Sequence, residues 1–270
     1  MLGSMACRYE HFETEWYAHW ATLTGHPAGV SDDLPLSYRK LWEWSAIMQA
    51  LAERGMLQAG RAGIGFAVGM EALPSIFASY GVDVLASDLP EEMSDGFWDQ
   101  SSQHSVSVDA LFHPRYLDEA TFRRLVRFRP TDMNDLSGLP DASWDFAWSS
   151  CAIEHLGGLD QGLDFVRNAM RLLKPGGVAV HTTEYNCSSN DDTVTDGGAV
   201  IYRKQDLERL DYSLRPMRCG LEPLNFDLGT HRYDLDYDEP PYFSTGSRHI
   251  KLAMQGYIAT SYLIIVQKAG

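Results

Sequence analysis

A glycine-rich stretch follows the first strongly apolar run of the chain. Five residues in and just after the run at 61–66 could contact a ligand: Gly63, Gly65, Phe66, Gly69 and Glu71. A glycine turn between a strand and a helix lets the backbone approach a ligand closely, and it exposes amide groups at the helix N-terminus. The glycine spacing is one residue longer than the G-x-G-x-x-G pattern of dinucleotide sites, so a turn without a ligand is the alternative.

A carboxylate follows the second apolar run. Asp88 comes directly after 82–87 and lies 23 residues beyond Gly65. A carboxylate at the end of a second strand can accept hydrogen bonds from both ribose hydroxyls of an adenosine-type cofactor. A helix cap or a solvated loop residue is the alternative, and the preceding glycine turn favours ribose binding.

Asp132 and Met133 follow the third apolar run, at 126–129. An aspartate and the backbone amides at this strand end can bind the amino edge of adenine, with the Met133 side chain against the ring. Asp and Asn are also common in turns, so these residues alone do not establish a nucleotide site.

Two glutamates and two histidines follow the fourth and fifth apolar runs: Glu154, His155, His181 and Glu184. A neutral histidine near pH 7 is suited to taking a proton from a hydroxyl, and Glu184 could orient the ring of His181. We expect the His181 side chain to emerge where the fifth strand leaves the sheet; a buried structural histidine is the alternative. Glu154 and His155 could instead support the helix that follows them. Because His181 and Glu184 lie three residues apart on a strand-to-loop exit, they need not face the same way, and we predict no metal site.

Alternating strands and helices would bring these residues to one edge of a sheet. Short apolar runs predict strands at 61–66, 82–87, 126–129, 144–149, 178–183, 221–228 and 257–267. Longer amphipathic stretches predict helices near 70–80, 118–125, 159–173 and 204–216. This alternation predicts a Rossmann-like α/β fold with a mostly parallel sheet and helices on both faces. No helix separates the last two strands, so we expect them to form an antiparallel C-terminal pair.

Two helices precede the first strand. Phe12 and Trp16 begin an apolar stripe that predicts an amphipathic helix over 9–22. A second helix is expected over 37–58, with Ser37 as its N-cap.

We therefore divide the chain into an N-terminal helical cap, 1–58, and an α/β domain, 59–270. Two long polar segments, near 89–116 and 229–256, interrupt this domain as insertions. Segments of this length without regular structure usually have a function or are disordered, and we expect these two to cover the site.

Composition argues against several function classes. The formal net charge is −15, from 22 Lys and Arg against 37 Asp and Glu. Such a surface repels phosphate backbones and anionic lipid, so we expect no general nucleic-acid binding. The four cysteines form no C-x-x-C pair, which argues against a zinc knuckle. The sequence has neither 18 consecutive apolar residues nor a leader-like N-terminus, so we expect a cytoplasmic protein that does not insert into a membrane.

Taken in order, these stretches resemble one enzyme family. The ordered set comprises the glycine turn, the acidic end of the second strand, Asp-Met-Asn, Trp-Asp-Phe-Ala-Trp-Ser, Ile-Glu-His-Leu and Leu-Lys-Pro-Gly-Gly. Over residues 60–215 the chain is similar to the class I S-adenosylmethionine-dependent methyltransferases. The glycine turn departs from the usual Glu/Asp-x-Gly-x-Gly-x-Gly, and it resembles a subgroup found in sugar and cell-surface glycan biosynthesis. The resemblance implies S-adenosyl-L-methionine as cofactor and a seven-stranded sheet.

The resemblance also implies a role for each candidate residue. Asp88 would bind the ribose, Asp132 and Met133 the adenine, and Ser149 and Ser150 would line the sulfonium. The methionine part of the cofactor would lie against the glycine turn, at Gly63, Gly65, Phe66, Gly69 and Glu71. The reaction would be an in-line methyl transfer to a hydroxyl of a small molecule, sugar or glycan. A base drawn from His181, Glu184, His155 and Glu154 would assist it.

Other functions stay open at this point. A natural-product or other small-molecule methyltransferase could act on oxygen or nitrogen. No Asn-Pro-Pro-Tyr-type clamp follows the fourth strand, which argues against nucleobase and amide nitrogen. A nicotinamide-dependent reductase would need G-x-G-x-x-G, and a non-catalytic S-adenosylmethionine-binding module would be expected to lose motifs that are intact here.

Overall fold

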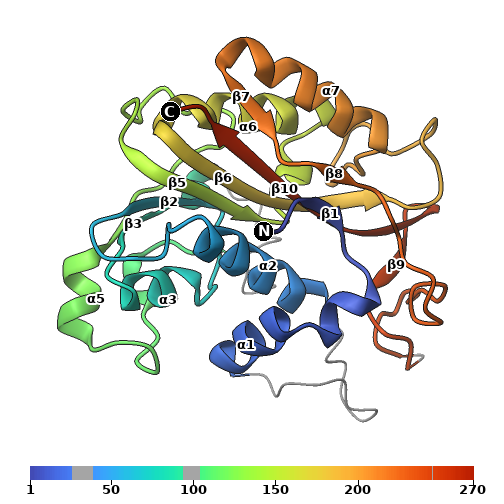
Figure 1. Cartoon of the computed structure of the whole chain (residues 1–270), viewed down its shortest axis with the longest axis horizontal. Coiled ribbons are helices and arrows are strands. Elements are labelled where there is room, and N and C mark those ends of the chain that lie inside the picture. The colour runs from blue at the N-terminus through green and yellow to red at the C-terminus, as the bar shows by residue number, and fades with distance from the viewer. Residues whose placement is uncertain (26–38, 94–103, 245) are drawn as a thin grey trace.

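A mixed sheet lies at the centre of the structure, a computed structural model that describes residues 1–25, 39–93, 104–244 and 246–270 (Figure 1). In these ranges, ten strands form the sheet: β1 (Ser4–Ala6), β2 (Ala62–Phe66), β3 (Asp83–Ala86), β4 (Val126–Phe128), β5 (Trp144–Ser150), β6 (Leu173–Asn186), β7 (Cys219–Leu221), β8 (Leu224–Asn225), β9 (Lys251–Met254) and β10 (Tyr257–Lys268). Their order is β4-β3-β2-β5-β6-β10-β1-β8, and β7 and β9 also pair with β10.

The strand directions confirm the predicted Rossmann-like α/β fold. The neighbouring strands from β4 through β6 are parallel. β10 runs antiparallel to β6, β7, β9 and β1, which includes the predicted pairing of β7 with β10. The described part of the sheet has ten strands instead of seven. The single strand expected over 221–228 is divided into β7, which ends at Leu221, and β8, which pairs with β1. β1 and β9 are additional, and they have only three and four residues, too few to produce a recognisable apolar run.

Helices cover both faces of the sheet: α1 (Glu15–Thr24), α2 (Arg39–Glu53), α3 (Leu73–Ser79), α5 (Glu119–Leu125), α6 (Leu159–Leu172) and α7 (Lys204–Leu214). Figure 1 shows α1, α2, α3 and α5 on one face, and α6 and α7 on the other. Successive side chains of a strand point to opposite faces. Along β5, Phe146 and Trp148 therefore join the core under α2 and α3, whereas Ala147 joins the core under α6.

The N-terminal part of the chain shares the first of these cores. α2 packs against β5, β6 and β10, and Trp42 is fully buried with its indole Nε1 donating to His11 Nδ1 at 3.1 Å. The expectation of a purely helical N-terminal part is wrong for the described residues, because β1 belongs to the sheet. The single helix expected over 9–22 is divided at Thr14, which separates a 3-10 turn at Tyr9–Glu13 from α1.

Two predicted features fall partly or wholly outside the described residues. These are the Ser37 N-cap and the central part of the 89–116 insertion, residues 94–103. Within the ranges that the structure covers, no helix combines the length and the apolar character needed to span a bilayer.

Candidate functional site

The turn after β2 leads into the first part of the predicted site. Gly63 and Gly65 lie within β2, where an added Cβ would come within 2.3 Å of the Phe146 ring and 2.2 Å of the Trp148 ring. Core packing under the sheet therefore explains why both positions are glycine. The expected contact of these two glycines with a cofactor stays a prediction. Phe66 points into the opposite core and packs edge-on against Phe165, so its side chain is a core residue.

Asp88 ties this turn to the segment after β3. Its Oδ2 accepts hydrogen bonds from the amides of Gly69, at 2.8 Å, and Ser105, at 3.1 Å, and its Oδ1 accepts from the Leu89 amide at 2.8 Å. Burial raises the pKa of Asp88, and the three amides oppose this rise. A carboxylate has about four acceptor positions, so the described contacts leave room for a further donor such as a ribose hydroxyl.

The loop after β4 lies beside Asp88, as expected for neighbouring parallel strands. The Thr131 amide donates to the Asp88 carbonyl oxygen at 2.8 Å. Asp132 is partly exposed and accepts from the Asn134 amide at 2.8 Å, which forms a local turn. Met133 is buried in the core under α6. Their predicted contact with adenine stays a prediction.

His181 lies inside the protein rather than at the edge of the sheet. Its Nδ1 is 2.8 Å from the Ser149 hydroxyl, its ring packs against Phe165, and both His181 and Ser149 are fully buried. Desolvation lowers the pKa of His181 to about 3, so the ring is neutral near pH 7. The expectation that this side chain emerges from the sheet is wrong, because β6 continues to Asn186 instead of ending near residue 183.

Glu184 is buried and paired with the first residue of α2. The Arg39 guanidinium donates to both carboxylate oxygens, at 2.6 and 2.5 Å, and also to the Ser261 hydroxyl at 3.4 Å. Such a two-point pair orients both side chains. Glu184 therefore does not orient His181 as predicted, because its carboxylate is turned to α2.

Lys40 joins the glycine turn to the end of β5. Its Nζ donates to the carbonyl oxygen and the hydroxyl of Ser150, at 3.0 and 2.8 Å, and forms ion pairs with Glu43 and Glu71 at 3.4 and 3.5 Å. Burial raises the pKa of Glu71 to about 6, against the opposing charge of Lys40. Two predicted cofactor residues, Ser150 and Glu71, are thus connected by a lysine of α2.

Cys151 and Glu154 follow β5 and complete the buried group. The Cys151 thiol donates to Glu43 Oε1 at 3.0 Å, and the Ser261 hydroxyl donates to the same oxygen. Glu154 is fully buried, and its Oε2 accepts from the Thr183 hydroxyl at 3.0 Å. Burial raises the pKa of Glu154, and the neighbouring His155 opposes this rise.

The predicted pair Glu154 and His155 lies together. His155 Nε2 is 4.0 Å from Glu154 Oε1, while His155 Nδ1 is 2.6 Å from the Gly198 carbonyl oxygen. The carbonyl requires a proton on Nδ1, which leaves Nε2 as the basic nitrogen of the neutral ring. No described residue donates a hydrogen bond to Glu154 Oε1, although this oxygen is buried.

We name these residues the α2–β6 cluster: Arg39, Lys40, Glu43, Glu71, Ser150, Cys151, Glu154, Thr183, Glu184 and Ser261. Sequence reasoning missed six of them: Arg39, Lys40, Glu43, Cys151, Thr183 and Ser261. One signal was present, because Glu43 precedes the buried residues Ile47 and Ala50 at helical spacing. A charge on the apolar face of a helix indicates a buried partner.

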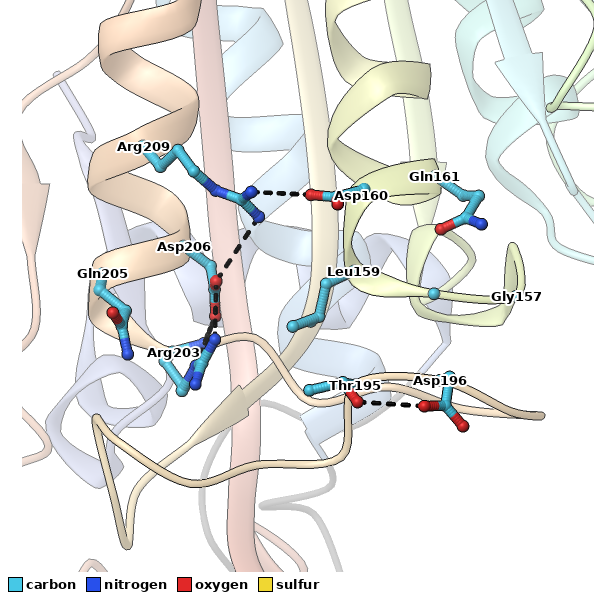
Figure 2. Close-up of a pocket in the computed structure, with 11 residues that line it drawn as sticks. Gly157, Leu159, Asp160, Gln161, Thr195, Asp196, Arg203, Gln205, Asp206 and Arg209 are labelled. Carbon is cyan, nitrogen blue, oxygen red and sulfur yellow. Dashed lines mark hydrogen bonds and ion pairs between the residues drawn. The ribbon is translucent and has the colours of Figure 1, made fainter.

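A separate cavity of about 480 Å³ lies between the start of α6 and the start of α7 (Figure 2). Its charged side chains pair with one another: Arg203 donates to Asp206 at 2.8 Å, and Arg209 lies 2.7 Å from Asp160. None of the predicted site residues lines it.

Comparison with known proteins agrees with this arrangement. Residues 63–181 match a family described as "Methyltransferase domain". A putative methyltransferase from Bacillus halodurans has a TM-score of 0.50 at 15% identity, over 83% of this chain and 100% of the other. A search of curated proteins gave no match.

Two further solved structures have slightly lower scores. A methyltransferase from Mesorhizobium loti has a TM-score of 0.49 at 16% identity, covering 83% of this chain and 98% of the other. A Burkholderia thailandensis N1-methyltransferase, solved with 1,6-didemethyltoxoflavin and S-adenosylhomocysteine, has a TM-score of 0.43 at 14% identity, covering 83% and 76%. The domain match runs from β2 into β6 and includes the carboxyl ends of β2 to β5, which carry the predicted cofactor residues. Residues 63–181 therefore form a methyltransferase domain.

Proposed function

We propose that this enzyme methylates a hydroxyl or an amine of a small molecule, sugar or glycan, and that Glu154 receives the proton that the acceptor loses. The observation that carries the proposal is the buried Glu154 Oε1, to which no described residue donates a hydrogen bond. Thr183 holds the other oxygen, so the carboxylate has a fixed direction. Burial raises the pKa of Glu154, and a carboxyl with a raised pKa is better matched to a base near neutral pH.

S-adenosylmethionine supplies an electrophilic methyl group on sulfur. The residues at the sheet edge fit this cofactor, because a tight turn with positive φ at Ala67 and Gly69 lies beside the Asp88 carboxylate. We assign the ribose to Asp88, adenine to Asp132 and Met133, and the sulfonium side to Ser150, as the family resemblance implies. Gly69 and Glu71 would then lie beside the methionine part.

The other predicted bases take different roles in this proposal. His181 is enclosed in the core with Ser149, so both serve the structure. Glu184 has both oxygens on Arg39 and positions α2 over the site. His155, whose side chain is 27% exposed, can pass a proton from Glu154 towards solvent.

Two acceptor groups have separate support. The hydroxyl follows from the resemblance to sugar and glycan methyltransferases, and a polar, charged cluster suits a sugar, whose hydroxyls both donate and accept. The amine is favoured by the excess of carboxylates over cations in the α2–β6 cluster.

The test is methyl transfer to a panel of sugars and amines by the wild type and by Glu154→Gln. We expect the variant to lose 10²–10⁴-fold in turnover, the usual contribution of a positioned base, with unchanged affinity for S-adenosylhomocysteine. Turnover equal to that of the wild type would exclude Glu154 as the base. His181→Gln is the matched control, and it should stay within a few-fold of the wild type.

A further inference from the structure

The α2–β6 cluster holds more negative than positive charge. Among the described residues, four buried carboxylates face two partly buried cations: Glu43, Glu71, Glu154 and Glu184 against Arg39 and Lys40. A buried charge is costly unless an opposite charge or hydrogen-bond donors compensate it. The excess of two charges therefore calls for a cationic ligand or for protonation.

The compensation is distributed unevenly within the cluster. Arg39 holds both oxygens of Glu184. Glu43 has Lys40 at 3.4 Å, and hydroxyl or thiol donors contact both of its oxygens. Glu154 has only the Thr183 hydroxyl among these groups, and its nearest described basic nitrogen is 4.0 Å away on half-buried His155. Glu71 shares Lys40 with Glu43, at 3.5 Å, and its Oε2 is also buried without a described donor. Of the four carboxylates, Glu154 is the one with no described Arg or Lys nitrogen within 4.0 Å.

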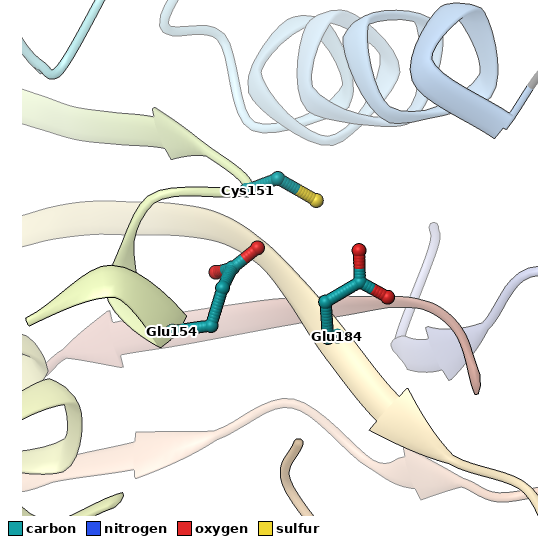
Figure 3. Close-up of side chains that lie close together, drawn as sticks. All are labelled: Cys151, Glu154 and Glu184. Carbon is teal, nitrogen blue, oxygen red and sulfur yellow. The ribbon is translucent and has the colours of Figure 1, made fainter. Parts of the chain in front are cut away.

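Three acceptor atoms surround the place that Glu154 faces. One ligand atom each of Cys151, Glu154 and Glu184 lies within 4.8 Å of the other two, and Figure 3 shows the three side chains pointing toward one another. An ammonium group has three N–H donors. If the three ligand atoms lay at the full separation of 4.8 Å, at the corners of an equilateral triangle, a nitrogen at its centre would be about 2.8 Å from each of them. This is a normal hydrogen-bond distance.

A metal ion suits these three atoms less well. Both oxygens of Glu184 already accept from Arg39, which a metal would have to displace. The Cys151 thiol donates to Glu43, and burial together with the surrounding carboxylates raises its pKa well above the usual value. Metal ligation needs the thiolate. A ligand that brings its own N–H donors requires neither the displacement of Arg39 nor the deprotonation of Cys151.

We infer that the acceptor is a protonated amine, such as that of an amino sugar or an amino alcohol, bound by Glu154, Glu184 and Cys151. This inference rests on the proposed function and narrows its acceptor. The Glu154 carboxylate takes one proton from the ammonium and becomes a carboxylic acid. The freed nitrogen lone pair then forms the bond to the methyl carbon as the carbon–sulfur bond breaks and its electron pair stays on sulfur. The products are a methylated ammonium and neutral S-adenosylhomocysteine.

Three cofactor analogues test the inference without a known acceptor. The full chain is titrated by calorimetry with three ligands that differ at the methyl-transfer position. S-adenosylhomocysteine is neutral at sulfur, and S-adenosylmethionine has a sulfonium cation that offers no N–H donor. In sinefungin, a carbon that bears an amine replaces the methylated sulfur. We expect sinefungin to bind at least tenfold more tightly than either of the other two. Glu154→Gln should reduce this preference to less than threefold, while its affinity for S-adenosylhomocysteine stays that of the wild type. Glu119→Gln, an exposed carboxylate on α5, is the control and should keep the full preference.

Each other outcome has a definite meaning. Equal affinity of the wild type for sinefungin and S-adenosylhomocysteine overturns the amine site, and this result stands even if the variant does not fold. Tighter binding of S-adenosylmethionine than of sinefungin overturns it in favour of sulfonium recognition. An absorption band of Co²⁺–thiolate on addition of Co²⁺, lost in Cys151→Ser, overturns it in favour of a metal. Failure of all three analogues to bind would contradict the proposed function itself.

Discussion

The two sides of the sheet edge are built differently. On the proposed cofactor side, Asp88 holds the turn after β2 through backbone amides that lie at most 19 positions away in the chain. On the proposed acceptor side, Arg39 and Lys40 of α2 contact side chains 145 and 110 positions away. One side thus depends on a single carboxylate and local amides, and the other on long-range pairs of charges. Removing one partner should cost more on the acceptor side, because it leaves a buried charge unpaired.

The largest effect is expected for Arg39→Met. This substitution removes the guanidinium and leaves Glu184 buried without its partner, which should cost about 3–5 kcal/mol of unfolding free energy. Urea unfolding measures the loss. Arg123→Met is the control, because Arg123 forms exposed pairs with Glu119 and Asp109 and should change stability by about 0.2–1 kcal/mol. Equal losses in the two variants would refute the contrast.

The second prediction concerns the core between the two sides. His181 has a folded-state pKa of about 3, below the 6.5 of an unfolded histidine. The unfolded state therefore binds the proton first, so this contribution to stability is complete above pH 6.5 and is lost as pH falls towards 3. Between pH 7 and 4.5, the wild type should lose about 2.7 kcal/mol more unfolding free energy than His181→Gln. If the unfolding free energies of the two proteins change in parallel with pH, His181 binds its proton as readily in the folded state as in the unfolded state.

Asp88→Ala tests the cofactor side. Loss of the hydrogen bonds to the ribose should weaken S-adenosylhomocysteine binding by about 1.5–3 kcal/mol, measured by calorimetry. Because Asp88 also holds the Gly69 turn, thermal unfolding of the same variant shows whether the turn survives. Unchanged affinity in a folded variant would remove Asp88 from the cofactor site.

The smallest effect is expected for Gly69→Ala. Gly69 has a φ of +50°, and an alanine there should cost about 1–2 kcal/mol of stability. Gly176, with a φ of +77° and nothing within 4 Å of an added Cβ, is the matched control. Both alanine variants should lose similar stability, but only Gly69→Ala should also weaken S-adenosylhomocysteine binding. If Gly176→Ala weakens binding equally, the effect is global.

The same contrast explains what the sequence could predict. The strand ends at Asp88 and Asp132 follow from short patterns, since each apolar run and its polar end are adjacent in the chain. The α2–β6 cluster has no such pattern, because its contacts join segments more than 100 positions apart. His181 shows a further difficulty. Residues 178–183 predicted a strand of ordinary length. Because polar residues follow them, the sequence indicated a strand end there, whereas β6 continues through buried Glu184 to Asn186.

β10 has a consequence for how the chain is made. This last strand pairs with β6, β1, β7 and β9, and the Ser4 carbonyl oxygen accepts a hydrogen bond from Tyr262, 258 positions later. At the usual ribosomal rate, β1 waits on the order of tens of seconds for its partner. β6 is made later, and from Asn186 until residue 257, on the order of ten seconds, it presents an unpaired edge that could join another nascent chain. The sheet therefore cannot be completed before β10 is made, and a ribosome stalled before residue 257 would hold a chain with an open sheet and an incomplete first core.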